Sequence, residues 1–144
     1  MSESGFDLGL DNPSRAGVYF VTSNDLHTMR MAACDAGLLT RNIDLQGCKT
    51  KQTLLLRVTS ALDTPPGSSR NWDALSDQLR DLGWLPAAGY ALLFDDASDF
   101  RDVDETSFDT LLDILQETAT EWTQREVPFW AFLALAETEF GAET

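Results

Sequence analysis

The sequence predicts an α/β domain in which helices flank a small parallel sheet. Four short strand-like segments alternate with amphipathic segments long enough to connect parallel strands. One of these segments, 90–94, carries no charged residue, as expected of a strand that a parallel sheet buries on both faces. With 144 residues, the chain is long enough for one domain with its own core and short for two.

The chain begins its regular structure with a strand and a helix. Residues 17–21 are rich in residues that favour strands. A helix is predicted over 23–36, because Ser23 or Asn24 can cap its start and Gly37 can end it. This pair forms the first strand–helix unit of the domain.

A second strand and helix follow. Apolar and polar residues alternate over 39–45, which indicates a strand. Thr50 can cap the next helix, predicted over 50–62. Residues 63–69 then interrupt the pattern, because two prolines deny helix donors and a glycine permits a turn.

The second half predicts a helix over 71–83 that ends at a glycine, then the buried strand 90–94. An acidic loop leads from this strand into the longest helix, 104–123, and residues 127–135 form the last strand. The order is therefore strand-helix-strand-helix-helix-strand-helix-strand, which favours right-handed crossovers between parallel strands.

The two ends of the chain are polar. We expect residues 1–16 to be a flexible tail, 17–136 the single domain and 137–144 a second polar tail. The start has neither the basic nor the apolar part of a signal peptide, and no apolar run approaches the 18 residues of a membrane span. Cys34 and Cys48 are too few for a disulfide framework, so we expect reduced thiols in a cytoplasmic protein, with a bridge between them as the alternative.

The negative charge lies in one half of the chain. The formal net charge is −14, while residues 1–70 hold seven acidic and seven basic residues. All of the net charge therefore falls within 71–144. Such a field disfavours nucleic acid and anionic membranes as partners and accelerates encounter with a basic protein. A surface that only maintains solubility is the alternative.

The helix at 71–83 carries three aspartates in one stripe. Asp73, Asp77 and Asp81 recur every four residues, so they share one face, and Asp77 can pair with Arg80. The opposite, core-facing side consists of Trp72, Leu75, Leu79 and Leu82. Like charges at this spacing cost a helix about 0.2–0.5 kcal/mol per pair. A positively charged partner explains the stripe better than helix stability does.

The predicted helix over 104–123 carries a second stripe of carboxylates at the same spacing, opposite its apolar face. Its members are Glu105, Asp109, Asp113, Glu117 and Glu121.

Enzymatic chemistry has little support in the sequence. His27 is the only histidine, and its position beside Asp25 early in a helix suits a solvated or capping role. The sequence has no nucleophile elbow, zinc-type spacing or phosphate-binding glycine motif. The enzymatic alternative is Mg²⁺ at Asp95 and Asp96, which follow a parallel strand but have only Arg101 as a nearby cation. We therefore expect no catalysis, no cofactor and no metal.

These features together resemble the barstar family, the intracellular inhibitors of barnase-type ribonucleases. The resemblance covers about 39–132, and its parts are Asn71–Leu75, Asp77, Leu79, Trp84, Tyr90–Phe94, Phe100, Glu117 and Phe129–Leu133. It implies a small parallel-sheet fold that blocks a ribonuclease active site with the acidic helix. The residues ahead of the match would add a β-α unit.

The family resemblance also assigns roles to side chains. It implies that Asp77 takes the place of a substrate phosphate, that Asp73 is a second contact and that Glu117 contributes from the neighbouring helix. Trp72, Ser76 and Asp81 complete the expected partner-binding set.

The chain departs from the family pattern beside this set. Ser76 stands where an aromatic residue is frequent, residues 65–69 lack the expected aromatic–glycine pair, and Arg70 adds a positive charge. The expected function is an inhibitor or immunity protein against a basic ribonuclease or other toxin. The first alternative is the same fold binding a different basic protein, and the second is the magnesium enzyme.

Overall fold

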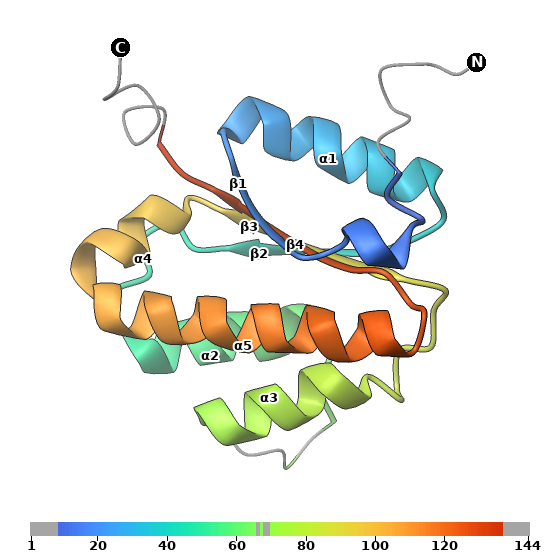
Figure 1. Ribbon diagram of the computed structural model, residues 1–144. Helices are drawn as coiled ribbons and strands as arrows, with labels where there is room; N and C mark the ends of the chain where they lie inside the picture. The colour runs from blue at the N-terminus through green and yellow to red at the C-terminus, as the bar shows by residue number, and fades with distance from the viewer. Residues whose placement is uncertain (1–8, 66, 68–69, 137–144) are drawn as a thin grey trace.

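The computed structural model describes residues 9–65, 67 and 70–136, which form a four-stranded sheet with helices on both faces (Figure 1). The strands are β1 (Val18–Val21), β2 (Leu39–Asp44), β3 (Tyr90–Asp95) and β4 (Phe129–Ala134). The helices are α1 (Ser23–Asp35), α2 (Lys51–Ala61), α3 (Trp72–Asp81), α4 (Ala97–Val103) and α5 (Glu105–Gln124), preceded by the 3-10 turn η2 (Pro13–Arg15). The predicted α/β class is confirmed.

All neighbouring strands are parallel, in the order β1-β4-β3-β2. Although β1 precedes β2 in the chain, it lies at the opposite edge of the sheet. Its register pairs Val18 with Ala131 and Val21 with Ala134. The first strand–helix unit therefore extends the sheet beside β4, and α1 crosses the sheet to reach β2 (Figure 1).

The helices form unequal layers on the two faces of the sheet. α1 covers one face, α2 and α5 cover the other, and α3 lies outside α2 and α5, away from the sheet (Figure 1). This arrangement leaves one long side of α3 directed at solvent while its apolar side packs inward.

Burial on both faces accounts for the apolar composition of the central strands. Tyr90, Leu92 and Phe94 of β3 join the larger core, on the side of α2 and α5. Ala91 and Leu93 point the other way, into a smaller core beneath α1. Since successive strand residues alternate between faces, a strand covered on both sides has no position for an exposed polar residue.

The prediction of an acidic loop between β3 and the longest helix is wrong over most of the segment, because residues 97–103 form α4. Asp96, the residue before this helix, lies in the left-handed region, with φ of 54°. Ala97 and Phe100 then reach the core and are each 0 % exposed. Ser98 holds the helix to the end of β4, because its Oγ accepts a hydrogen bond from the Ala136 N–H at 2.8 Å. The burial of two apolar side chains, Ala97 and Phe100, is thus enough to stabilise a helix in a segment that is otherwise mostly polar.

The predicted stop of α3 at Gly83 is also displaced. The helix ends at Asp81, and Leu82, not the glycine, adopts the left-handed conformation with φ of 48°. That conformation costs a non-glycine residue about 1–2 kcal/mol. Leu82 is 1 % exposed, and the burial of its side chain offsets this strain.

Residues 9–16, expected to belong to the first tail, contact the domain. Leu10 is 4 % exposed, and its carbonyl accepts a hydrogen bond from Trp130 Nε1 at 2.8 Å. The Pro13 carbonyl accepts another from Thr123 Oγ1 at 3.1 Å. Residues 1–8 and 137–144 lie outside the described residues, and the domain limits at 17 and 136 stay predictions.

The cysteines are not bridged. Cys34 is free and exposed, whereas Cys48 is free and buried, so the alternative of a Cys34–Cys48 disulfide is wrong for this structure. Burial raises the pKa of the Cys48 thiol above its ordinary value, although Arg57 and a hydrogen bond to Thr50 oppose the shift. In the described part of the chain, no helix has the length and apolar character needed to cross a membrane.

Candidate functional site: an acidic face on two helices

α3 is held in place by its cap and by its apolar side. The Asn71 side chain caps the helix by accepting a hydrogen bond from the Ala74 N–H at 2.7 Å. Leu75 and Leu79 are buried in the core. Trp122 of α5 donates from Nε1 to the Leu79 carbonyl at 2.8 Å. These contacts fix the helix in orientation, so its solvent-facing side is a stable feature of the fold.

The three predicted aspartates lie together on that side. Asp73, Asp77 and Asp81 are all exposed. Trp72 and Ser76, the other α3 residues of the predicted partner-binding set, are half-buried. Trp72 packs against the larger core and therefore stabilises the helix on its apolar side. The backbone carbonyl of Ser76 accepts a hydrogen bond from Arg80. The structure thus brings the carboxylates together and separates them from Trp72.

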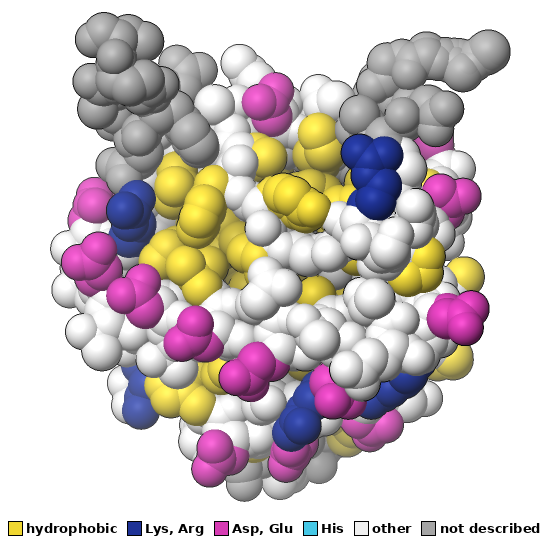
Figure 2. All heavy atoms as spheres, in the orientation of Figure 1, with side chains coloured by type: hydrophobic (Ala, Val, Ile, Leu, Met, Phe, Trp, Pro, Cys, Tyr) yellow, Lys and Arg dark blue, Asp and Glu magenta, His cyan; other side chains and the backbone are white. Residues whose placement is uncertain are grey.

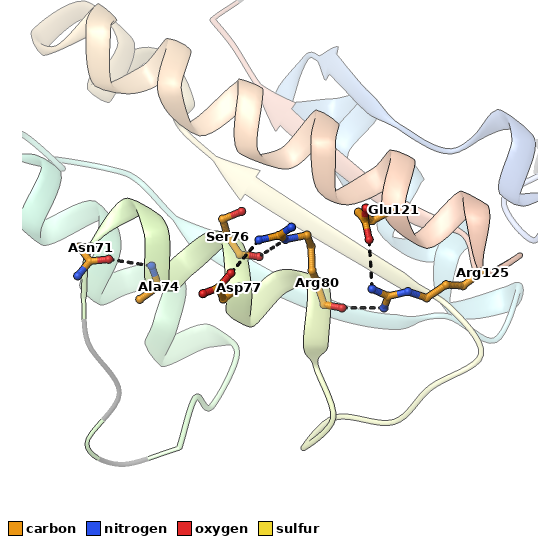
Figure 3. A network of polar contacts seen from close by, with 7 residues as sticks. All are labelled: Asn71, Ala74, Ser76, Asp77, Arg80, Glu121 and Arg125. Carbon is orange, nitrogen blue, oxygen red and sulfur yellow. Dashed lines mark hydrogen bonds and ion pairs between the residues drawn. The ribbon is translucent and has the colours of Figure 1, made fainter.

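The centre of this face is an ion pair (Figure 3). Asp77 Oδ1 lies 2.7 Å from Arg80 Nη2, as the spacing predicts. Arg80 Nε also donates to the Ser76 carbonyl at 3.2 Å. The carbonyl of Arg80 accepts a hydrogen bond from Arg125 Nη1 at 2.7 Å, and Arg125 Nη2 lies 3.4 Å from Glu121 Oε1. The network connects the end of α3 to the end of α5.

Sequence reasoning did not identify the role of Arg125. Its guanidinium carbon lies 4.4 Å from the centre of the Trp122 ring, a cation–π arrangement, while the same group binds the final turn of α3. Carbonyls in the last turn of a helix have no partner within the helix, and a cation satisfies one of them. The two residues joined by this bond are 45 positions apart, so helical periodicity holds no signal of it.

The second acidic stripe lies along α5. Glu105, Asp109, Asp113 and Glu117 are exposed and Glu121 is half-buried. Acidic side chains form a row along α5 and gather again over α3, with Lys or Arg side chains between the two groups (Figure 2). Because α3 packs on α5, the two stripes lie on neighbouring helices, and the two acidic groups appear on the same side of the molecule (Figure 2); together the stripes are here called the acidic face. Glu117, the predicted contribution of the neighbouring helix, belongs to it.

Part of the loop before α3 lies outside the described residues. These residues are Pro66, Ser68 and Ser69, so the expected departure from the family's aromatic–glycine pair lies partly outside the described residues. Pro65, Gly67 and Arg70 are exposed.

Asp95 and Asp96 lie at the carboxyl end of β3. Burial raises the pKa of Asp95, and the negative charges of Asp96 and Asp44 raise it further, while Arg30 lowers it. The pKa of Asp96 is also raised, by burial first and then by Asp99 and Asp44. Within the described residues, no three His, Cys, Asp or Glu side chains are arranged to hold a metal ion. The magnesium alternative therefore gains no support from the geometry.

The raised pKa of Asp95 leads to a stability prediction. A carboxyl whose pKa is higher in the folded than in the unfolded state loses folding stability as pH rises from its unfolded value near 3.9. The ionised group therefore destabilises the fold at neutral pH. We expect Asp95→Asn to be more stable than the parent in urea unfolding at pH 7, and this gain to shrink at pH 4. A variant less stable at pH 7 would contradict the prediction.

His27 takes no part in the acidic face. It is exposed on α1, across the sheet from α3, and its Nδ1 lies 2.9 Å from Arg30 Nη2 (Figure 1). The prediction of a solvated role agrees with this exposure.

Fold and surface define the class of protein. This is a small α/β domain whose outermost helix buries its apolar side and presents carboxylates to solvent. A family model described as barstar (barnase inhibitor) matches residues 38–134, which is more than half of the chain. The chain belongs to the barstar family.

The matched region begins just before β2 and ends with β4, so β1 and α1 precede it. It agrees closely with the range of 39–132 expected from the sequence. A search of curated protein sequences finds no match to the chain.

Proposed function

We propose that this protein is an inhibitor that binds a basic ribonuclease, or another basic toxin, by inserting α3, with its stripe of aspartates, into the active site of that enzyme. The observation that carries the proposal is the stripe of Asp73, Asp77 and Asp81 on a barstar-family helix whose opposite side is locked in the core. A toxin-neutralising immunity protein of the cytoplasm is the corresponding cellular role.

Each side chain has a part in this proposal. Asp77 and Asp73 are the central contacts, where carboxylates facing a desolvated guanidinium bind strongly. Asp81 and Glu117 flank them, and their charges mainly raise the association rate. Trp72 fixes α3 from the core side, and Ser76 provides close approach because its side chain is small. The inhibitor needs no catalysis, cofactor or metal of its own.

A second candidate is an interaction module of the same fold that binds a basic protein without inhibiting a ribonuclease. The observation that favours it is the Arg80–Asp77 pair, which places a cation at the centre of the proposed contact.

One experiment separates the two candidates. The tagged full chain is used to capture partners from extracts of its own cells at low salt, where electrostatic association is strongest. For the inhibitor, we expect a basic nuclease that is inactive in the complex and regains activity on dissociation at high salt. A captured basic protein with no nuclease activity after dissociation would favour the interaction module. Recovery of no basic protein would count against both.

A further inference from the structure

The free protein does not present a bare carboxylate in the middle of the aspartate stripe on α3. Asp77 Oδ1 and Arg80 Nη2 lie 2.7 Å apart, and their side chains are 77 % and 41 % exposed. Both charges are therefore open to an approaching partner. A partner that contacts Asp77 also meets the guanidinium of Arg80.

Arg80 is held at this position by more than its ion pair. Its Nε binds the Ser76 carbonyl one turn earlier, and its own carbonyl is fixed by Arg125. If a partner cation takes the Asp77 carboxylate, the Arg80 guanidinium stays within a side chain's reach of the same spot. The two cations then repel each other in an interface that excludes water, where like charges disfavour binding.

We propose that Arg80 determines partner specificity, and that the partner carries an Asp or Glu beside the Arg or Lys that binds Asp77. This inference rests on the proposed function of the acidic face. In the complex, the partner's cation binds Asp77 and its carboxylate binds Arg80, so the internal pair is exchanged for two intermolecular ones. A partner surface that holds only cations is selected against, because Arg80 finds no acceptor there.

A cation-only probe tests the selection against bare positive charge. Nonalysine peptide is titrated into the full chain, and the amide NMR signals of α3 report its binding. We expect Arg80→Gln to bind nonalysine at α3 about two- to fivefold more tightly than the parent, because an exposed competing pair is removed. Lys49→Gln is the matched control, since it removes one exposed positive charge outside α3. An equal gain in the control, or no gain in Arg80→Gln, would overturn the inference.

With a basic protein captured by the acidic face, Arg80→Gln is expected to bind more weakly than the parent, which is the opposite of the result expected with nonalysine. Arg80→Gln should weaken that complex about tenfold or more, because the partner's carboxylate loses a charged hydrogen-bond donor. Tighter or unchanged binding of the variant would overturn the assignment of an acidic partner residue. If no basic protein is captured, the proposed function fails, while the nonalysine titration still decides whether Arg80 shields Asp77.

Discussion

Asp77→Ala is expected to weaken the complex with the basic partner by about 2–5 kcal/mol, the range found when one member of a buried, charged contact is removed. Asp77 is exposed in the free protein and occupies the middle of the stripe on α3. Its loss leaves the partner's cation buried without a counter-charge, so we expect the dissociation rate to increase most. Surface-based binding kinetics at two salt concentrations would determine the dissociation rate, and calorimetry would check the affinity.

Two aspartates elsewhere serve as controls for this measurement. Asp96→Ala is expected to change the affinity little, but Asp96 adopts a left-handed conformation that alanine disfavours, so the folding stability of this variant needs checking. Asp35→Ala is the better match, because Asp35 is exposed at the end of α1 on the opposite face of the sheet. Equal and small losses for Asp77, Asp96 and Asp35 would show that binding depends on net charge and not on the proposed face.

Phe100→Ala is expected to destabilise the fold by about 3–5 kcal/mol, the usual cost of removing a fully buried phenylalanine. Phe100 is 0 % exposed and anchors α4, which otherwise consists mostly of polar residues. Urea unfolding at pH 7, with the midpoint and slope both recorded, would measure the loss.

Val103→Ala provides the matched control within the same helix. Val103 is 54 % exposed, and we expect its replacement to change the unfolding free energy by less than about 0.5 kcal/mol. A Phe100 variant as stable as the Val103 variant would mean that α4 is not held by the core.

The helix α4 also illustrates where sequence patterns stop being informative. Only Ala97 and Phe100 of this helix are buried apolar residues, and they stand among acidic ones. The helix is also too short to show a helical period in its sequence. Its first turn depends on Asp96 adopting a left-handed conformation, which the Asp-Asp dipeptide does not encode. The end of α3 is a similar case. The sequence predicts that the helix ends at Gly83, but Leu82 adopts the left-handed conformation, and the burial of the Leu82 side chain offsets the strain.

By contrast, the sequence itself determined the features that repeat along one element. The uncharged run of β3, the carboxylate stripe on α3 and the apolar face of α5 all follow from the periods of strands and helices, which are local properties. The family motif from Asn71 to Leu75 located the acidic face for the same reason: its residues are neighbours on one helix.

Only the tertiary structure decided which distant residues meet. It placed β1 beside β4 and not beside β2, and it brought Arg125 to the last turn of α3, next to the Arg80–Asp77 pair. Such contacts depend on how whole elements pack, and packing is set by the shapes and volumes of side chains far apart in the chain. The sequence therefore determined that α3 presents carboxylates, whereas the fold decided that α5 continues the surface and that Arg125 fixes the helix end beside it.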